Sequence, residues 1–165
     1  MKKLLIIIVL FVTGCSSKDS SPMQRGLQSE SLILSGEQRA TSSAQKVLRV
    51  TRGMVESGEI IRGGCWDYLD TAFTRAGFSR NARTSVYKST IKGPYANVNM
   101  LRPGDWIYHV NHSYGGVGHS GMFVEWINRK NAIALMLSYA GERRKEPARY
   151  KAYDLSSVYN VLRVE

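Results

Sequence analysis

Residues 63–77 read GGCWDYLDTAFTRAG. Apolar side chains recur in this stretch at three- and four-residue spacing, which predicts an amphipathic helix from Cys65 to Ala76. Gly77 suits the C-terminal end of such a helix. Gly63 and Gly64 allow the backbone to turn sharply just before it. The pattern therefore predicts a cysteine at the N-terminus of a helix that packs on an apolar core.

The flanking sequence predicts helices first and strands afterwards. The same spacing of apolar residues predicts another helix over residues 44–56, and the Pro-Gly pair at 103–104 predicts a turn. Residues 78–100 are expected to be mostly loop. Strands are expected over 106–110, 119–127, 132–139, 149–153 and 159–164, with a hairpin turn over 128–131. This order predicts an α+β fold with N-terminal helices packed on a C-terminal antiparallel β-sheet.

The first residues carry a targeting signal. Two lysines precede an apolar run over residues 4–12, which is shorter than the roughly 20 residues that span a bilayer. Its length and flanks are typical of a signal peptide, here residues 1–14. The segment that ends in Cys15 resembles a lipobox, which implies that Cys15 is lipidated and becomes the first residue of the mature protein. The alternative is an ordinary cleaved signal peptide with an incidental cysteine.

Composition divides the remaining chain into a tether and one domain. Residues 15–43 are rich in Ser, Gln, Gly and charged side chains, which predicts a lipid-anchored flexible tether. Residues 44–165 suffice for one domain with its own core. The formal net charge of +10 suits anionic envelope neighbours such as lipid headgroups or cell-wall polymers. Nucleic acid is not an expected partner of a secreted chain that lacks a recognisable binding motif.

The cysteine count makes Cys65 the central residue. The chain has two cysteines, so lipidation of Cys15 leaves Cys65 without a disulfide partner. Such a thiol is either buried as a packing residue or retained for its reactivity. A helix N-terminus favours the reactive thiolate, and its N–H groups can stabilise an oxyanion. A histidine would then act as base toward the thiol.

Three motifs occur in a fixed order along the chain. They are Gly64-Cys65-Trp66-Asp67-Tyr68, Leu101-Arg102-Pro103-Gly104-Asp105-Trp106 and Gly118-His119-Ser120-Gly121-Met122-Phe123-Val124. Together they resemble the NlpC-type and CHAP-type cysteine peptidases, which are papain-like amidases and endopeptidases of the cell wall. The resemblance implies a papain-like domain over residues 44–165, with Cys65 as nucleophile, His119 as base and no cofactor.

The third catalytic position departs from that pattern. A polar group on the strand after the one that carries His119 normally orients the histidine. The strand expected at 132–139 contains no His, Asn, Gln, Asp or Glu, and Ser138 is its nearest positional match. A serine can orient a ring nitrogen, but it stabilises imidazolium less than a carboxylate does.

Other candidate residues have structural explanations. His109 and His112 have a spacing that occurs in metal sites, but no acidic or thiol ligand lies near them in the sequence, so no metal is expected and both are placed near the cleft. Asp105 is expected to cap the Pro-Gly turn. Trp66 is expected to pack in the core. Strand alternation places Glu125 on the same face as His119.

These observations define the expected functions. The first is a monomeric cysteine hydrolase that cuts amide bonds in peptidoglycan peptides, lipid-anchored in the bacterial envelope on the outer membrane facing the periplasm. The alternative is an inactive or weakly active papain-like lipoprotein that binds cell wall or an envelope partner. A third class is a transferase or deamidase that uses the same dyad on a protein substrate.

Overall fold

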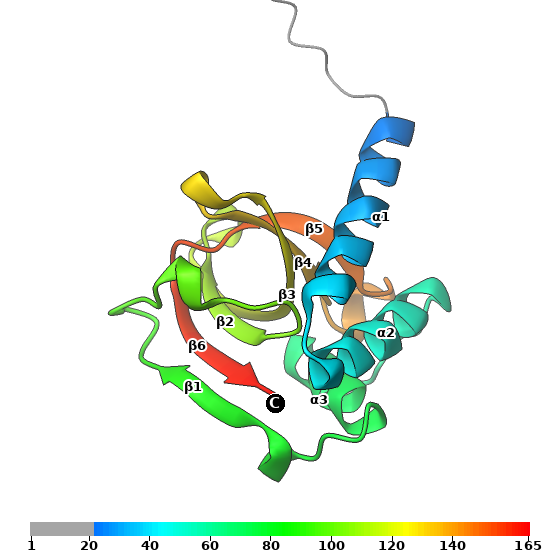
Figure 1. The fold of residues 1–165 in the computed structure, drawn as a ribbon, viewed down its shortest axis with the longest axis horizontal. Coiled ribbons are helices and arrows are strands. Elements are labelled where there is room, and N and C mark those ends of the chain that lie inside the picture. The colour runs from blue at the N-terminus through cyan, green and yellow to red at the C-terminus, as the bar shows by residue number, and fades with distance from the viewer. Residues whose placement is uncertain (1–21) are drawn as a thin grey trace, which may run out of the picture.

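The computed structural model describes residues 22–165. Within them, three helices precede six strands: α1 (Pro22–Arg39), α2 (Ser42–Glu56), α3 (Cys65–Arg75), β1 (Thr84–Lys88), β2 (Trp106–Asn111), β3 (Val117–Asn128), β4 (Ile133–Ser138), β5 (Arg149–Asp154) and β6 (Val158–Arg163) (Figure 1). The predicted α+β class, with N-terminal helices and an antiparallel sheet, is confirmed. The predicted signal peptide and Cys15 lie outside the described residues.

The six strands form one antiparallel sheet in the order β1-β6-β2-β3-β4-β5. The sheet curls strongly, so that β2 to β5 surround an interior (Figure 1). Side chains alternate between its two faces. On β3, Met122 and Val124 face the core beneath the helices, whereas Phe123 faces the core inside the curl.

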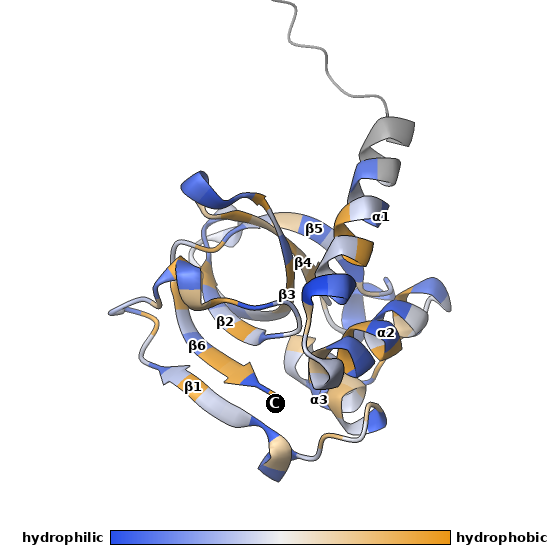
Figure 2. Cartoon of the chain, viewed as in Figure 1, coloured by the Kyte–Doolittle hydropathy of each residue, from blue (hydrophilic) through white to orange (hydrophobic). Residues whose placement is uncertain are grey.

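The core beneath the helices sets the position of α3. The apolar side of α3, which includes Leu69 and Phe73, packs with Val47 and Leu48 of α2 against Trp106 of β2. Hydrophobic and hydrophilic residues alternate along α1 and α2 (Figure 2), as expected for helices that cover a sheet. The N-terminal end of α3 is thereby held near the beginning of β3 and the end of β4.

The predicted flexible tether is wrong for residues 22–39, which form α1. This helix packs on β3, where a side chain at Gly36 would meet the Val124 carbonyl oxygen. Leu32 and Ile33, an apolar island in a polar segment, contact the core beneath the helices. Most of the other residues of α1 are polar or glycine, which explains why its composition resembled a linker. Among the described helices, none has both the length and the apolarity needed to cross a membrane.

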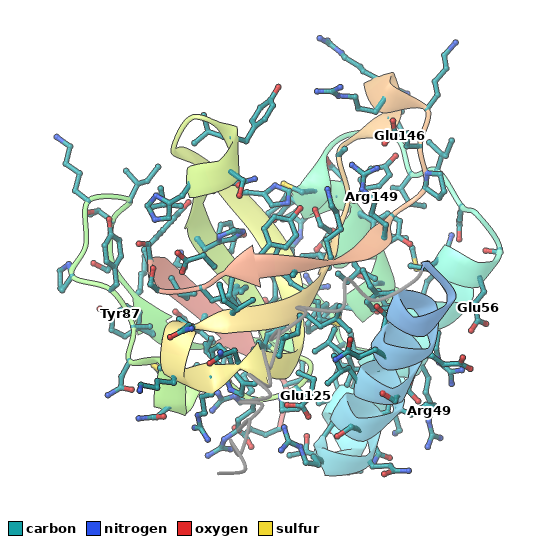
Figure 3. The ribbon with its side chains drawn as sticks, turned by 90° about the horizontal axis from the view of Figure 1, so that it is seen from above. Arg49, Glu56, Tyr87, Glu125, Glu146 and Arg149 are labelled. Carbon is teal, nitrogen blue, oxygen red and sulfur yellow. The ribbon has the colours of Figure 1, made fainter. Side chains whose placement is uncertain are left out.

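Charged contacts join α1 to its neighbours. Glu37 is buried and accepts a hydrogen bond from Arg52 of α2 at 2.7 Å. Glu125 of β3, which is labelled in Figure 3, is also buried. It accepts hydrogen bonds from Ser35 and Arg39. The placement of Glu125 on the face of His119 is therefore wrong. The register of β3 against β4 shifts between Phe123 and Glu125, and this bulge turns Glu125 toward α1.

Part of the segment predicted as loop is a strand. β1 pairs with β6 at the edge of the sheet, and the Tyr87 hydroxyl donates to the Pro94 carbonyl at 2.8 Å (Figure 3). Most of β1 is exposed. A short edge strand that buries little apolar surface leaves only a weak hydrophobic pattern, which explains why the sequence did not reveal it.

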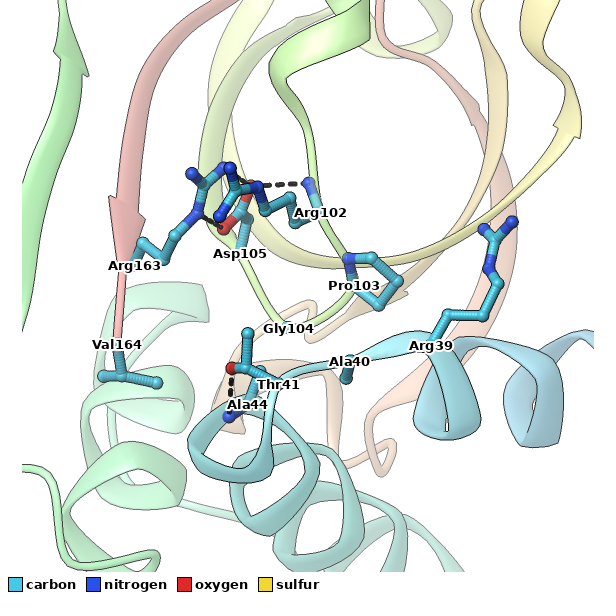
Figure 4. A pocket seen from close by; sticks show the side chains of 10 residues that line it. All are labelled: Arg39, Ala40, Thr41, Ala44, Arg102, Pro103, Gly104, Asp105, Arg163 and Val164. Carbon is cyan, nitrogen blue, oxygen red and sulfur yellow. Dashed lines mark hydrogen bonds and ion pairs between the residues drawn. The ribbon is translucent and has the colours of Figure 1, made fainter.

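The predicted Pro-Gly turn fixes β2 to α2 and β6. Gly104 has a φ of +89°, and a Cβ there would lie 2.7 Å from the Cβ of Ala44 (Figure 4). Asp105 accepts a hydrogen bond from the Arg102 N–H at 2.8 Å, which confirms its expected role as a cap. Burial raises the pKa of the Asp105 carboxyl, and two hydrogen bonds from Arg163 oppose that increase. This motif therefore supports the fold at a distance from Cys65.

Candidate active site

Cys65 is the first residue of α3, as predicted. The Gly64 N–H donates to the Asp67 carboxylate at 2.7 Å, which completes the first turn. Gly63 has a φ of +106°, and a Cβ there would lie 2.2 Å from the same carboxylate. Gly63 is thus required by its close approach to the helix, whereas a Cβ at Gly64 would lie 4.0 Å from the Asp67 carboxylate. The Cys65 N–H lies in the first turn, where backbone donors have no acceptor within the helix.

The structure brings Cys65 and His119 together. Cys65 and His119 line the same cleft. Burial raises the pKa of the Cys65 thiol, but the neighbouring His119 and Ser120 lower it more, from an ordinary value of 9.0 to about 7. His119 lies near the beginning of β3, opposite His109 of β2. A large share of Cys65 would therefore be thiolate at neutral pH, and the thiolate is the nucleophilic form.

Ser138 lies beside His119, at the end of β4. The Nε2 atom of His119 and the Oγ atom of Ser138 are 2.9 Å apart. The hydroxyl of Tyr153, on β5, donates to the same Oγ at 2.9 Å. Because Nε2 is engaged by Ser138, Nδ1 is the ring nitrogen left for the thiol. His119, Ser138 and Tyr153 are thus joined by hydrogen bonds, and together with Cys65, which lines the same cleft, they make up a polar chain.

His109 completes the surroundings of His119. Its side chain is fully buried inside the curled sheet, and among residues 22–165 neither of its ring nitrogens has a hydrogen-bond partner. Its ring packs edge-on against His119 at 5.7 Å and Tyr153 at 5.4 Å between centroids. Burial and the neighbouring His119 lower the pKa of His109 to about 4, so its ring is neutral at pH 7. His109 lies in β2, within the strand expected over 106–110, and it is buried behind His119 and Tyr153 rather than lining the cleft itself.

A cleft of about 680 Å³ opens over this polar chain, which contributes Cys65, His119, Ser138 and Tyr153 to its lining. One wall is the turn His112–Tyr114, and the other is the loop between β4 and β5 with part of β5. That loop is tied to the backbone in front of Cys65, since the Glu142 N–H donates to the Gly63 carbonyl at 2.9 Å. The cleft is large enough for a peptide segment.

Sequence reasoning missed two residues of this site. Ser120 follows His119 directly, and its hydroxyl and backbone both lower the pKa of the Cys65 thiol. Within the described residues its buried hydroxyl has no hydrogen-bond partner. Its position directly after His119 was the only feature of the sequence that could have identified it. Tyr153 approaches Ser138 because β5 pairs with β4, and that pairing brings together residues with no shared motif.

Two remaining predictions concern residues outside this chain of contacts. Trp66 is partly buried and packs against the core, with its ring 5.7 Å from that of Trp106, as expected. His112 is exposed, and its Nε2 atom lies 3.0 Å from Ser157 Oγ. No group of three or more His, Cys, Asp or Glu residues within the described part of the chain is arranged to hold a metal ion.

Comparisons of the chain with protein-family models, with curated proteins and with solved structures gave no match in any of the three.

Proposed function

We propose that this protein is a papain-like cysteine hydrolase that cuts amide bonds in peptidoglycan peptides. The observation that carries the proposal is the placement of Cys65, at a helix N-terminus and with a pKa of about 7, in one cleft with a histidine that is itself hydrogen-bonded to Ser138. A nucleophile, a base and an orienting group in one cleft are the minimum set for covalent acyl transfer.

The first half of the reaction forms an acyl-enzyme. His119 takes the thiol proton, and the Cys65 thiolate attacks the substrate carbonyl carbon. The developing oxyanion accepts a hydrogen bond from the Cys65 N–H, near the positive end of the α3 dipole. The tetrahedral intermediate collapses as its C–N bond breaks. The leaving amine takes the proton from His119, and a thioester remains on Cys65.

The second half releases the acid product. His119, again neutral, takes a proton from water, and the resulting hydroxide attacks the thioester carbonyl. The C–S bond breaks, and the Cys65 thiolate leaves with the imidazolium as its partner. Ser138 accepts the Nε2–H of His119 in both halves and keeps Nδ1 toward the thiol. No step needs a cofactor.

The lipid anchor gives this activity its place in the cell. We propose that Cys15 is lipidated and holds the protein in the envelope, at the outer membrane facing the periplasm. Residues between Cys15 and α1 would separate the membrane from the domain, and the domain would act on nearby wall as a monomer. A stable anchor needs more than one acyl chain.

The test measures the rate of Cys65 alkylation by iodoacetamide against pH. The Cys15→Ser chain leaves Cys65 as its single thiol. We expect a rate that stays high down to about pH 7, well below the ordinary thiol range near 8.5. His119→Ala should move the profile toward the ordinary range. A slow rate that ignores the His119 substitution would make Cys65 a packing residue.

One observation favours a second candidate, a non-catalytic protein that binds cell wall or an envelope partner. The group beside His119 Nε2 is the neutral hydroxyl of Ser138, which stabilises imidazolium less than a carboxylate. Affinity for sacculi that survives Cys65→Ala, without release of fragments by the parent protein, would favour this candidate over the hydrolase.

A further inference from the structure

The cleft over Cys65 has an uneven distribution of charge. Its lining includes four cationic side chains, Arg143, Arg144, Arg149 and Lys151, and one carboxylate, Glu146. The carboxylate is neutralised, because Arg149 donates to Glu146 at 2.7 Å (Figure 3). Within residues 22–165, no ion pair holds the other three cations. The wall of the cleft therefore carries an uncompensated positive charge.

The backbone that carries these cations is bonded to the segments that form the active site. Arg143 and Arg144 follow Glu142, whose N–H is bonded to the Gly63 carbonyl two residues before Cys65. Gly141 approaches the same carbonyl, which a Cβ there would reach at 3.2 Å. Lys151 lies on β5, which pairs with the strand that carries Ser138. The backbone thus holds the charges beside the nucleophile.

The opening of the cleft adds a further contact. The Arg144 guanidinium reaches across to the Tyr114 hydroxyl, at 3.4 Å, and so joins the loop after β4 to the turn after β2. All three unpaired cations are exposed, so they keep their hydration until a ligand arrives. A ligand with negative charge gains attraction there without a large cost of burying charge.

We propose that Arg143, Arg144 and Lys151 form a specificity wall for a peptide substrate that carries a carboxylate close to the bond attacked by Cys65. This inference rests on the proposed function, since it names the class of peptide that the hydrolase selects. A neutral peptide of the same shape enters the cleft but gains nothing from the wall. The wall acts on the binding of the substrate and takes no part in the proton transfers.

The test compares two reagents that differ in one charge. Iodoacetate carries a carboxylate and iodoacetamide a neutral amide, and both alkylate Cys65 in the Cys15→Ser chain. For Cys65, the alkylation rate with iodoacetate is divided by the rate with iodoacetamide. The same ratio measured for β-mercaptoethanol, a small thiol free in solution, is the reference value. A shift in the pKa of Cys65 affects both rates and cancels in the ratio. A unit charge about 7 Å from a carboxylate changes a rate roughly threefold in water.

We expect the ratio for Cys65 to exceed that of the small thiol by about tenfold at low ionic strength and to fall toward it in high salt. The double variant Arg143→Gln/Lys151→Gln should lower the ratio by about five- to tenfold. Arg129→Gln/Lys130→Gln is the matched control, because it removes the same charges from the exposed turn at the far end of β3, roughly 30 Å along the strand. The control should leave the ratio unchanged.

The outcomes separate the two proposals. A reactive Cys65 whose ratio equals that of β-mercaptoethanol, or falls equally in both double variants, overturns the specificity wall and leaves the hydrolase intact. A Cys65 that is slow with both reagents and indifferent to His119→Ala overturns the hydrolase and the inference that rests on it.

Discussion

Replacing Ser138 with alanine should weaken the reactivity of Cys65 without disturbing the core. The Ser138 Oγ lies 2.9 Å from His119 Nε2 and is the group that holds the ring. A hydrogen bond to a neutral group contributes about 0.5–1.5 kcal/mol, whereas one to a charged group contributes about 1.5–3 kcal/mol. Ser138 therefore stabilises the imidazolium more than the imidazole, by about 1–1.5 kcal/mol.

That difference converts directly into a shift of the thiol pKa. About 1.36 kcal/mol corresponds to one unit, so Ser138→Ala should raise the pKa of Cys65 from about 7 by roughly one unit. At pH 7 and below, the alkylation rate should fall about five- to tenfold, and at high pH it should recover. Ser138→Asn restores a polar group beside Nε2 and should recover part of the loss. The assay is iodoacetamide modification from pH 5 to 10, followed by mass spectrometry.

A matched control separates a specific effect from a general one. Ser157 forms a similar contact with a histidine, His112, at 3.0 Å, and it lies outside the chain of contacts to Cys65. Ser157→Ala should leave the alkylation profile unchanged. An unaltered profile in Ser138→Ala, with a normal melting temperature, would refute the role given to the His119–Ser138 hydrogen bond.

Further predictions concern stability. Arg163→Leu leaves the Asp105 carboxylate buried without its partner, so the free energy of unfolding in urea should fall by about 3–5 kcal/mol; a loss below about 1 kcal/mol would show that Asp105 is protonated or hydrated. Gly104→Ala combines a φ of +89° with a contact of 2.7 Å to Ala44 and should cost about 2–3 kcal/mol. Gly53→Ala, inside α2 where a Cβ meets nothing within 4 Å, should instead stabilise the fold by about 0.4–1 kcal/mol. The pKa of Cys65 is depressed in the folded state, so its stabilisation is complete above about pH 9 and lost as the pH falls through 7. The free energy of unfolding of the parent, relative to that of Cys65→Ala, should rise by about 1–2 kcal/mol between pH 7 and 9, after screening by solvent. A difference between the two proteins that does not change with pH would contradict the lowered pKa.

The parts of the fold with strong local patterns were predictable from the sequence. The apolar spacing around Cys65 places α3 correctly, and its two glycines mark the turn into the helix. The hairpin between β3 and β4 follows from the polar residues 128–131. Both α1 and β1 escaped prediction because their stability comes from tertiary contacts. α1 depends on Glu37 and a small apolar island, and β1 depends on pairing with β6.

In the candidate active site too, residues in local motifs were predictable, whereas residues brought in by tertiary contacts were not. Cys65 and His119 stand in recognisable local motifs, and Ser138 was found by its position on the next strand. Tyr153 and the buried ring of His109 enter the site only through the pairing and curl of the sheet. A bulge in β3 reversed the expected side of Glu125, because one extra residue moves every later side chain to the other face. Long-range pairing of this kind leaves no trace in a single sequence.

The most direct test of the central claim is digestion of purified sacculi, with the soluble products analysed by mass spectrometry. The hydrolase account predicts peptide fragments that end in a new free amine and a new carboxyl group. It predicts that these fragments disappear with Cys65→Ser and His119→Ala. Unchanged sacculi, or fragments that persist when Cys65 is replaced by serine, would contradict it.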